Sequence, residues 1–334
     1  AQFDTAVPLI ETDGQVYSGA HAAFRTLPKH PACHWLLRTY ELAPLFAGVS
    51  EKAYRFVAGH RPLFSKLTCL GWGEHVEQPE HFRVRWIFLR GLALIYLIAF
   101  TSLWTQIDGL VGSKGILPTD QFMANATDQV KANGIGLDRY RLLPTLCWFS
   151  ATDASLHWQC AAGVVLSVLV LVGIAPVPCL ALLWLIYLSL STVCREFLGF
   201  QWDILLLETG FLAIFFAPRQ LWPRRAREAP PSRIVLWLLR LLLFKLMFQS
   251  GCVKLMSGDT LWRNLTALTM HYETQPLPTW LGWYAHQLPL WFQKFSCAIM
   301  FGIELGIPFL IFAPRRLRML AAASLASLQV LILL

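Results

Sequence analysis

The sequence is poor in charged residues and lacks the usual signatures of soluble enzymes. Asp, Glu, Lys and Arg make up only 14% of its 334 residues, whereas 56% are hydrophobic. The chain has no G-x-S-x-G elbow, no phosphate-binding P-loop, no H-E-x-x-H and no G-x-G-x-x-G. These absences argue against the common hydrolase, nucleotide-binding and zinc-protease sites, and no catalytic residue is predicted.

Cysteine is present, but no two cysteines form the C-x-x-C pair that is typical of redox or zinc sites. The eight cysteines are scattered along the chain. Cysteines within apolar runs or at their edges, among them Cys160, Cys179, Cys194 and Cys297, can pack as small hydrophobes. The sequence therefore predicts neither a metal site nor a cofactor.

Apolar runs and tryptophan are abundant instead, with 14 tryptophans in the chain. This composition predicts an α-helical polytopic membrane protein that is embedded in the lipid bilayer. The net charge of +8 does not indicate nucleic-acid binding, because the basic residues cluster between the apolar runs.

Six or seven of the apolar runs are close to the roughly 20 residues that a transmembrane helix needs. They follow a mixed-polarity region that we define as residues 1–82, and together they make up a membrane domain, residues 83–334. The fourth run is short. The runs cover residues 86–104, 156–174, 177–194, 201–217, 234–252, 291–312 and 317–334.

Basic loops predict the orientation of these spans. The loop APRQLWPRRAREAPPSR, between the fourth and fifth runs, carries five arginines, and PRRLR separates the last two runs. Because Lys and Arg concentrate in cytoplasmic loops, both loops and the N-terminal region are predicted to be cytoplasmic. Residues 105–155, 195–200 and 253–290 then face the periplasm of a bacterium or the lumen of the endoplasmic reticulum.

Charged residues within the spans are notable, because one such side chain at the bilayer centre costs at least about 2.5 to 3.5 kcal/mol unless it is paired. Counting about 1.5 Å per residue from the centre of each span, we expect Lys245 to pair with Glu208, and Arg240 to pair with Glu304. These pairs either fix helix register or belong to a functional site.

At the outer end of the third and fourth runs, CREFLGFQWDILLLETG gathers Arg195, Glu196, Trp202 and Asp203. Trp202 suits an interfacial anchor, and Asp203 can cap the helix that begins here.

The segment after the fifth run is polar and rich in aromatic residues. It leaves the membrane at Lys254, predicts a short surface helix near Thr260, and contains helix-stopping Pro276 and Pro278. The spacing of its His and Glu residues matches no specific metal site. The candidates for contact with a partner or ligand are Trp262, Arg263, Asn264, His271, Tyr272, Glu273, Trp283, Tyr284 and His286.

Several long stretches resemble the lipase maturation factor family. They are SGCVKLMSGD followed by WRNLTALTMHYETQPLPTWLGWYAHQLP, SLWTQIDGLVGSKGILP, RLLPTLCWFSATD and GFQWDILLLETGFLAIFFAP. The resemblance, over residues 85–334, implies a membrane protein that in animals resides in the endoplasmic reticulum and helps secreted dimeric lipases reach their active assembly. It implies a folding factor with no established reaction, whose client-binding part follows the membrane region.

Residues 1–80 resemble the later half of the DCC family of thiol-disulfide oxidoreductase-like domains, through QFDTAVPLIETDGQVYSGAHAAFRTLP and EKAYRFVAGHRPLF. This resemblance implies a partial thioredoxin-like α/β fragment whose Asp-x-x-Cys-x-x-Cys motif would lie upstream. Because the chain starts without Met and ends within an apolar run, we expect it to be part of a longer protein.

Two functions remain open on the sequence. The first is a membrane-embedded maturation factor that binds exported clients such as lipases. The alternative is a membrane enzyme with thiol-redox or lipid-directed chemistry.

Overall fold

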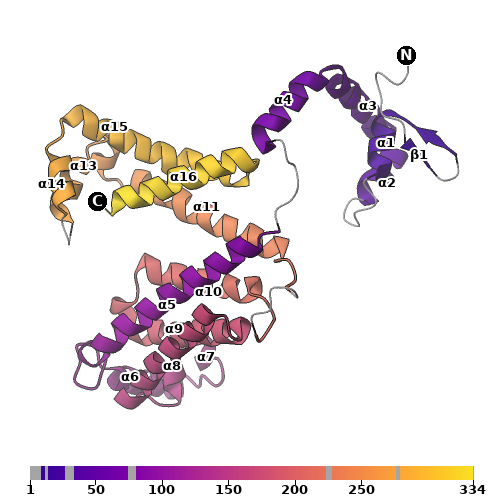
Figure 1. Ribbon diagram of the computed structural model, residues 1–334. Helices are drawn as coiled ribbons and strands as arrows, with labels where there is room; N and C mark the ends of the chain where they lie inside the picture. The colour runs from indigo at the N-terminus through magenta and orange to yellow at the C-terminus, as the bar shows by residue number, and fades with distance from the viewer. Residues whose placement is uncertain are drawn as a thin grey trace. The chain divides into compact units, whose positions relative to one another are not determined.

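The computed structural model describes residues 9–11, 14–26, 34–73, 80–222, 228–275 and 279–333. The chain divides into two compact units (Figure 1). One comprises Ala1–Glu77 and Phe312–Ala323, and the other comprises Gln78–Ile311 and Ser324–Leu334.

The first unit starts with a β-hairpin and continues as helices. Strands β1 (Leu9–Ile10) and β2 (Val16–Tyr17) pair antiparallel, as expected from the hairpin signal, although Asp13 lies outside the described residues. The helices are α1 (Gly19–Thr26), α2 (His34–Leu42), α3 (Pro44–Gly59) and α4 (Arg61–Trp72). Glu51 of α3 joins three of them, since it accepts hydrogen bonds from the Tyr40 hydroxyl at 2.9 Å and the His21 backbone N–H at 3.3 Å.

Five helices in the described part of the chain are long and apolar enough to cross a membrane. Four are α5 (Phe82–Leu110), α8 (Asp153–Val172), α9 (Pro176–Cys194, extended by η4, Arg195–Phe197) and α11 (Arg233–Met256). The fifth joins α15 (Leu290–Phe301) to π-helical η6 (Gly302–Gly306) and 3-10 helix η7 (Ile307–Phe312).

The two other predicted spans also form helices, but shorter ones. They are α10 (Gln201–Phe216), with 16 residues, and α16 (Arg315–Ile332), with 18 residues. All seven apolar runs therefore fold as helices, and the protein is a polytopic helical membrane protein.

Short helices connect the spans. Between α5 and α8 lie α6 (Thr119–Ala132), α7 (Arg139–Leu142) and η3 (Leu146–Trp148). Between α11 and α15 lie α12 (Thr260–Arg263), α13 (Leu268–Thr274) and α14 (Trp280–His286). The single surface helix expected from Thr260 is thus two helices, because Leu265 takes a left-handed backbone conformation (φ 59°) that interrupts it.

The core of the second unit lies between α5, α8, α9 and α10, where α5 packs on α8, α8 on α9 and α9 on α10. Tyr96, Phe100 and Tyr187 meet at its centre, with ring centroids 5.5 to 6.2 Å apart. Gly163 on α8 makes room for them, because a Cβ at this position would lie 2.3 Å from the Phe100 ring. Small residues allow this kind of close approach between membrane helices.

Candidate functional site

One end of the core of the second unit brings together residues 105–155 and 195–200, which the sequence predicts to be non-cytoplasmic. There α5 and α9 end while α8 and α10 begin. Trp104 and Asp108, one turn apart on α5, both contact His157 of α8. The Trp104 indole N–H lies 2.9 Å from His157 Nδ1, and His157 Nε2 lies 2.9 Å from an Asp108 oxygen. Because the indole only donates, Nδ1 accepts, so Nε2 carries the proton that binds Asp108.

A buried polar network fixes the turn that precedes α8. The Ser189 hydroxyl of α9 donates to Gln159 of α8 at 2.7 Å and accepts from the Leu146 backbone N–H at 2.8 Å. It also lies 3.1 Å from the Thr145 hydroxyl. Since buried polar groups are costly unless they are bonded, this network holds η3 rigidly against α8 and α9.

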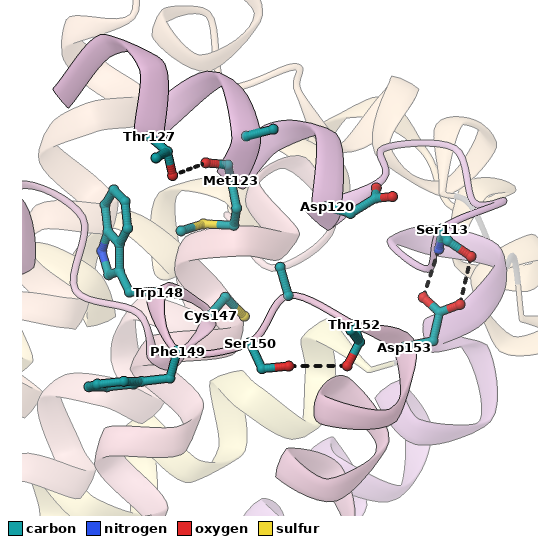
Figure 2. A pocket seen from close by; sticks show the side chains of 12 residues that line it. Ser113, Asp120, Met123, Thr127, Cys147, Trp148, Phe149, Ser150, Thr152 and Asp153 are labelled. Atoms are coloured by element: carbon teal, nitrogen blue, oxygen red, sulfur yellow. Dashed lines mark hydrogen bonds between the residues drawn. The ribbon is translucent and has the colours of Figure 1, made fainter. Parts of the chain in front are cut away.

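A pocket of about 550 Å³ opens beside this turn; we name it the loop pocket. Figure 2 shows Cys147 and Ser150 on its wall, Trp148 and Phe149 toward one end, and Asp153 at the other. It is lined by Ser113, by α6 residues including Asp120, Met123 and Thr127, and by residues 147–153.

The two ends of the loop pocket differ in chemistry. At one end, Asp153 accepts hydrogen bonds from the Ser113 backbone N–H at 2.8 Å and from its hydroxyl at 2.6 Å. At the other, Phe149 is 78% exposed and stacks on Tyr140, with ring centroids 6.3 Å apart. The pocket can therefore take an apolar group and a neighbouring hydrogen-bond donor. Its residues were not predicted, although Trp148, Phe149 and Asp153 lie in one of the family-like stretches.

Lys254, at the end of α11, joins the second segment that is predicted to be non-cytoplasmic to the spans. Its ammonium lies 2.5 Å from Glu304, which is only 2% exposed, and 2.9 Å from the Ser250 hydroxyl. It also lies 5.5 Å from the centre of the Trp262 ring, which packs edge-on against Phe301. Trp262 is thus half-buried and holds α12 against α11 and α15.

The expected pairing of Arg240 with Glu304 is wrong, because Glu304 pairs with Lys254 instead. Gly251 explains why Glu304 lies next to the end of α11 and not next to Arg240. A Cβ there would lie 2.7 Å from the Leu305 side chain and 3.1 Å from the Glu304 Cβ, so this glycine lets η6 approach α11 closely. Gly251 lies about 16 Å along the helix from Arg240 at about 1.5 Å per residue.

The expected pairing of Lys245 with Glu208 is confirmed, between α11 and α10. Asp203 caps α10 as expected, since the Phe200 backbone N–H donates to it at 3.3 Å. It also accepts a hydrogen bond from the Tyr187 hydroxyl at 2.6 Å, which the sequence did not suggest. Among the other interface residues, the Arg195 guanidinium lies 4.6 Å from the centre of the Phe122 ring.

The three residues considered as metal ligands do not come together. His286 Nε2 lies 3.0 Å from Glu273, whereas the His271 ring contacts the Gln275 amide at 2.7 Å. No group of three His, Cys, Asp or Glu side chains suited to a metal occurs in the described ranges. Burial, followed by the nearby charge of Lys254, lowers the pKa of His271.

The remaining candidates separate into buried and exposed side chains. Tyr272 is half-buried, and this burial raises the pKa of its hydroxyl. Arg263 and Asn264 are exposed. On α14, Trp283 and Tyr284 are each 62% exposed and Trp280 is 72% exposed. We call these three residues the aromatic surface of α14.

Comparison with known proteins decides the family. The profile of the lipase maturation factor transmembrane domain matches residues 83–334. The chain belongs to the lipase maturation factor family. Lipase maturation factor 2 of Gallus gallus is 46% identical over 262 residues, which cover 75% of this chain and 36% of that protein. Lipase maturation factor 2 of Homo sapiens is 44% identical over 270 residues, covering 75% and 37%.

A second branch of the family is also similar. Lipase maturation factor 1 of Homo sapiens is 36% identical over 246 residues, covering 72% of this chain and 43% of that protein. The chain thus spans less than half the length of these relatives. No solved structure gives a significant match.

Proposed function

We propose that this lipase maturation factor family protein is a membrane-embedded maturation factor for secreted lipases, and that it acts by binding its client. Family membership supports the proposal, since its relatives are named lipase maturation factors. The observation that carries the binding step is the aromatic surface of α14. Large aromatic side chains supply much of the binding free energy at protein interfaces, and three of them are exposed here.

The loops provide a rigid platform for such contacts. Short helices with little packing of their own would move, but Trp262 packs against Phe301, and the Gln293 amide of α15 donates to the Ala285 carbonyl of α14 at 2.6 Å. A preorganised surface loses less conformational entropy when it binds. We propose that the loop pocket is a second contact on the same side of the membrane.

The basic loops support one orientation for this activity. With the N-terminal unit in the cytoplasm, residues 105–155 and 253–290 meet exported proteins in the lumen of the endoplasmic reticulum or, in a bacterium, in the periplasm.

Site-specific photocrosslinking in the full-length protein tests the proposal. A photoreactive amino acid replaces Trp283, which is 62% exposed, in cells that co-express a secreted dimeric lipase. We expect a crosslink to that lipase. The matched control replaces Trp222, which is 65% exposed and lies in a loop predicted to be cytoplasmic. Lipid adducts alone at Trp283, or equal lipase capture at both positions, would contradict client binding by α14.

A further inference from the structure

A second cavity, of about 590 Å³, lies along α5 in the same unit. Its other walls are Tyr187 of α9, η4 and the start of α10; we call it the α5 groove. Residues of α5 line it at intervals of three or four, so they form one stripe of the helix. The stripe includes Ile95, Ile98, Ala99, Ser102, Gln106 and Leu110. At about 1.5 Å per residue it is about 22 Å long.

The polarity of the α5 groove changes along its length. Its deeper part is bordered by Ile95 and Ile98, which are 53% and 60% exposed on a helix that crosses the membrane. Toward the end of α5 the stripe carries Ser102 and Gln106, and Glu196 of η4 lines the same region. A groove that is apolar at bilayer depth and polar near the interface matches an amphiphile, with its chain inward and its head outward.

The charge of the α5 groove restricts the head of that amphiphile. Two carboxylates, Glu196 and Asp203, line it, and no Lys, Arg or His is among the described residues of its wall. Asp203 is 4% exposed, and its hydrogen-bond donors, the Tyr187 hydroxyl and the Phe200 backbone N–H, carry no charge. A buried carboxylate without a cationic neighbour favours a cation from outside.

We propose that the α5 groove binds a membrane phospholipid whose headgroup ends in an ammonium group. One acyl chain lies along Ile95, Ile98 and Ala99, and the ammonium lies by Glu196 and Asp203. The Ser102 hydroxyl, which accepts a hydrogen bond from the Gln106 amide, is a neutral donor at the depth of the phosphate. An anionic phospholipid would place its charged head beside two carboxylates, which is unfavourable.

Native mass spectrometry of the purified full-length protein tests this site. Phosphatidylethanolamine and phosphatidylglycerol with identical chains are titrated separately. We expect about fivefold tighter binding of phosphatidylethanolamine, since one partly exposed ion pair contributes up to about 1 kcal/mol. Glu196→Gln should reduce this preference while binding persists. Equal affinities in the unchanged protein, or a preference that Glu196→Gln leaves intact, would overturn the charge assignment.

A steric pair of variants tests the location. Ala99→Trp fills the α5 groove and should remove the tightest lipid adduct, whereas Leu94→Trp, on the same helix but outside the lining, should keep it. Ser102→Phe replaces Ala99→Trp if the latter does not elute as a single monodisperse peak. An adduct that survives a folded groove-filling variant would refute the site.

Discussion

At the scale of single residues, Glu304 has the most demanding environment among the candidates. It is 2% exposed, Lys254 is the cation beside it, and its second carboxylate oxygen is buried without a hydrogen-bond partner in the described structure. Removing one partner of a buried pair leaves an uncompensated charge. That loss costs about 3 to 5 kcal/mol, more than the pair itself contributes.

We therefore expect Lys254→Met to lower the thermal midpoint of the purified protein substantially and to reduce its folded yield. The double variant Lys254→Met, Glu304→Gln should recover most of the loss, because no charge is then left unpaired. Size-exclusion profiles and thermal unfolding in one detergent measure both effects. A single variant as stable as the unchanged protein would show that Glu304 does not need this cation.

His271 gives a prediction about pH. Its pKa is lowered by burial and by the charge of Lys254, so the folded state favours the neutral ring. The unfolded chain, with an ordinary histidine pKa of about 6.5, takes up a proton first as the pH falls. The stability that His271 contributes is thus present above this value and is lost in acid.

The thermal midpoint should therefore drop less between pH 7.5 and pH 5.5 in His271→Gln than in the unchanged protein. His60→Gln, at an exposed histidine of the first unit, is the matched control for the loss of a histidine elsewhere in the chain. The same slope in all three proteins would refute the assignment. Differential scanning fluorimetry at matched ionic strength provides the comparison.

At the scale of elements, Gly163 governs the pairing of α5 with α8. A methyl group there would lie 2.3 Å from Phe100, which is fully buried and packs against Tyr96 and Tyr187. Gly163→Ala should destabilise the protein by about 1 to 3 kcal/mol through overpacking. The control is Gly91→Ala on α5, where a Cβ meets nothing within 4 Å. It should be neutral or stabilising by up to about 1 kcal/mol, because alanine favours helix.

Chemical or thermal unfolding of both variants measures whether each substitution stabilises or destabilises the protein. If Gly163→Ala matched Gly91→Ala, the close packing of α8 on Phe100 would be refuted.

The elements differ in how far the sequence predicts them. Apolar runs are local signals, so all seven correspond to helices in the structure. The pairing of Lys245 with Glu208 was also predictable, whereas the pairing of Glu304 with Lys254 was not. The predicted pairs were chosen by counting residues from the centre of each span, which assumes that the centres of neighbouring helices lie at the same depth. Glu304 does not obey this assumption, because η6 packs closely against α11 at Gly251.

The loop pocket escaped prediction for a related reason. It depends on Ser189, which bonds Leu146 and Gln159 across 43 and 30 positions of sequence. The spacing of apolar residues along the sequence does not predict a contact between residues so far apart. The capping of α10 by Asp203 was predictable because it involves neighbours three residues apart.

At the scale of the whole molecule, the proposed client binding depends on which loops face exported proteins. The loop before α11 and the segment after it are separated by one helix that is long and apolar enough to cross a membrane, so we expect them to lie on opposite sides. The buried Arg85 at the start of α5 contacts the end of the basic loop. It binds Glu228 at 2.7 Å and the Ala229 carbonyl at 3.0 Å. The first span therefore starts on the same side as the basic loop.

A reporter that is active only in the cytoplasm should accordingly be active when fused after residue 222 and inactive when fused after residue 275. A second reporter, active only outside the cytoplasm, should give the inverse pattern with the same two fusions. If both fusions reported the same side, α11 would not cross, and two cytoplasmic fusions would also exclude client binding by α14. If the pattern were reversed, the aromatic surface of α14 would face the cytoplasm, where it could not meet a secreted lipase.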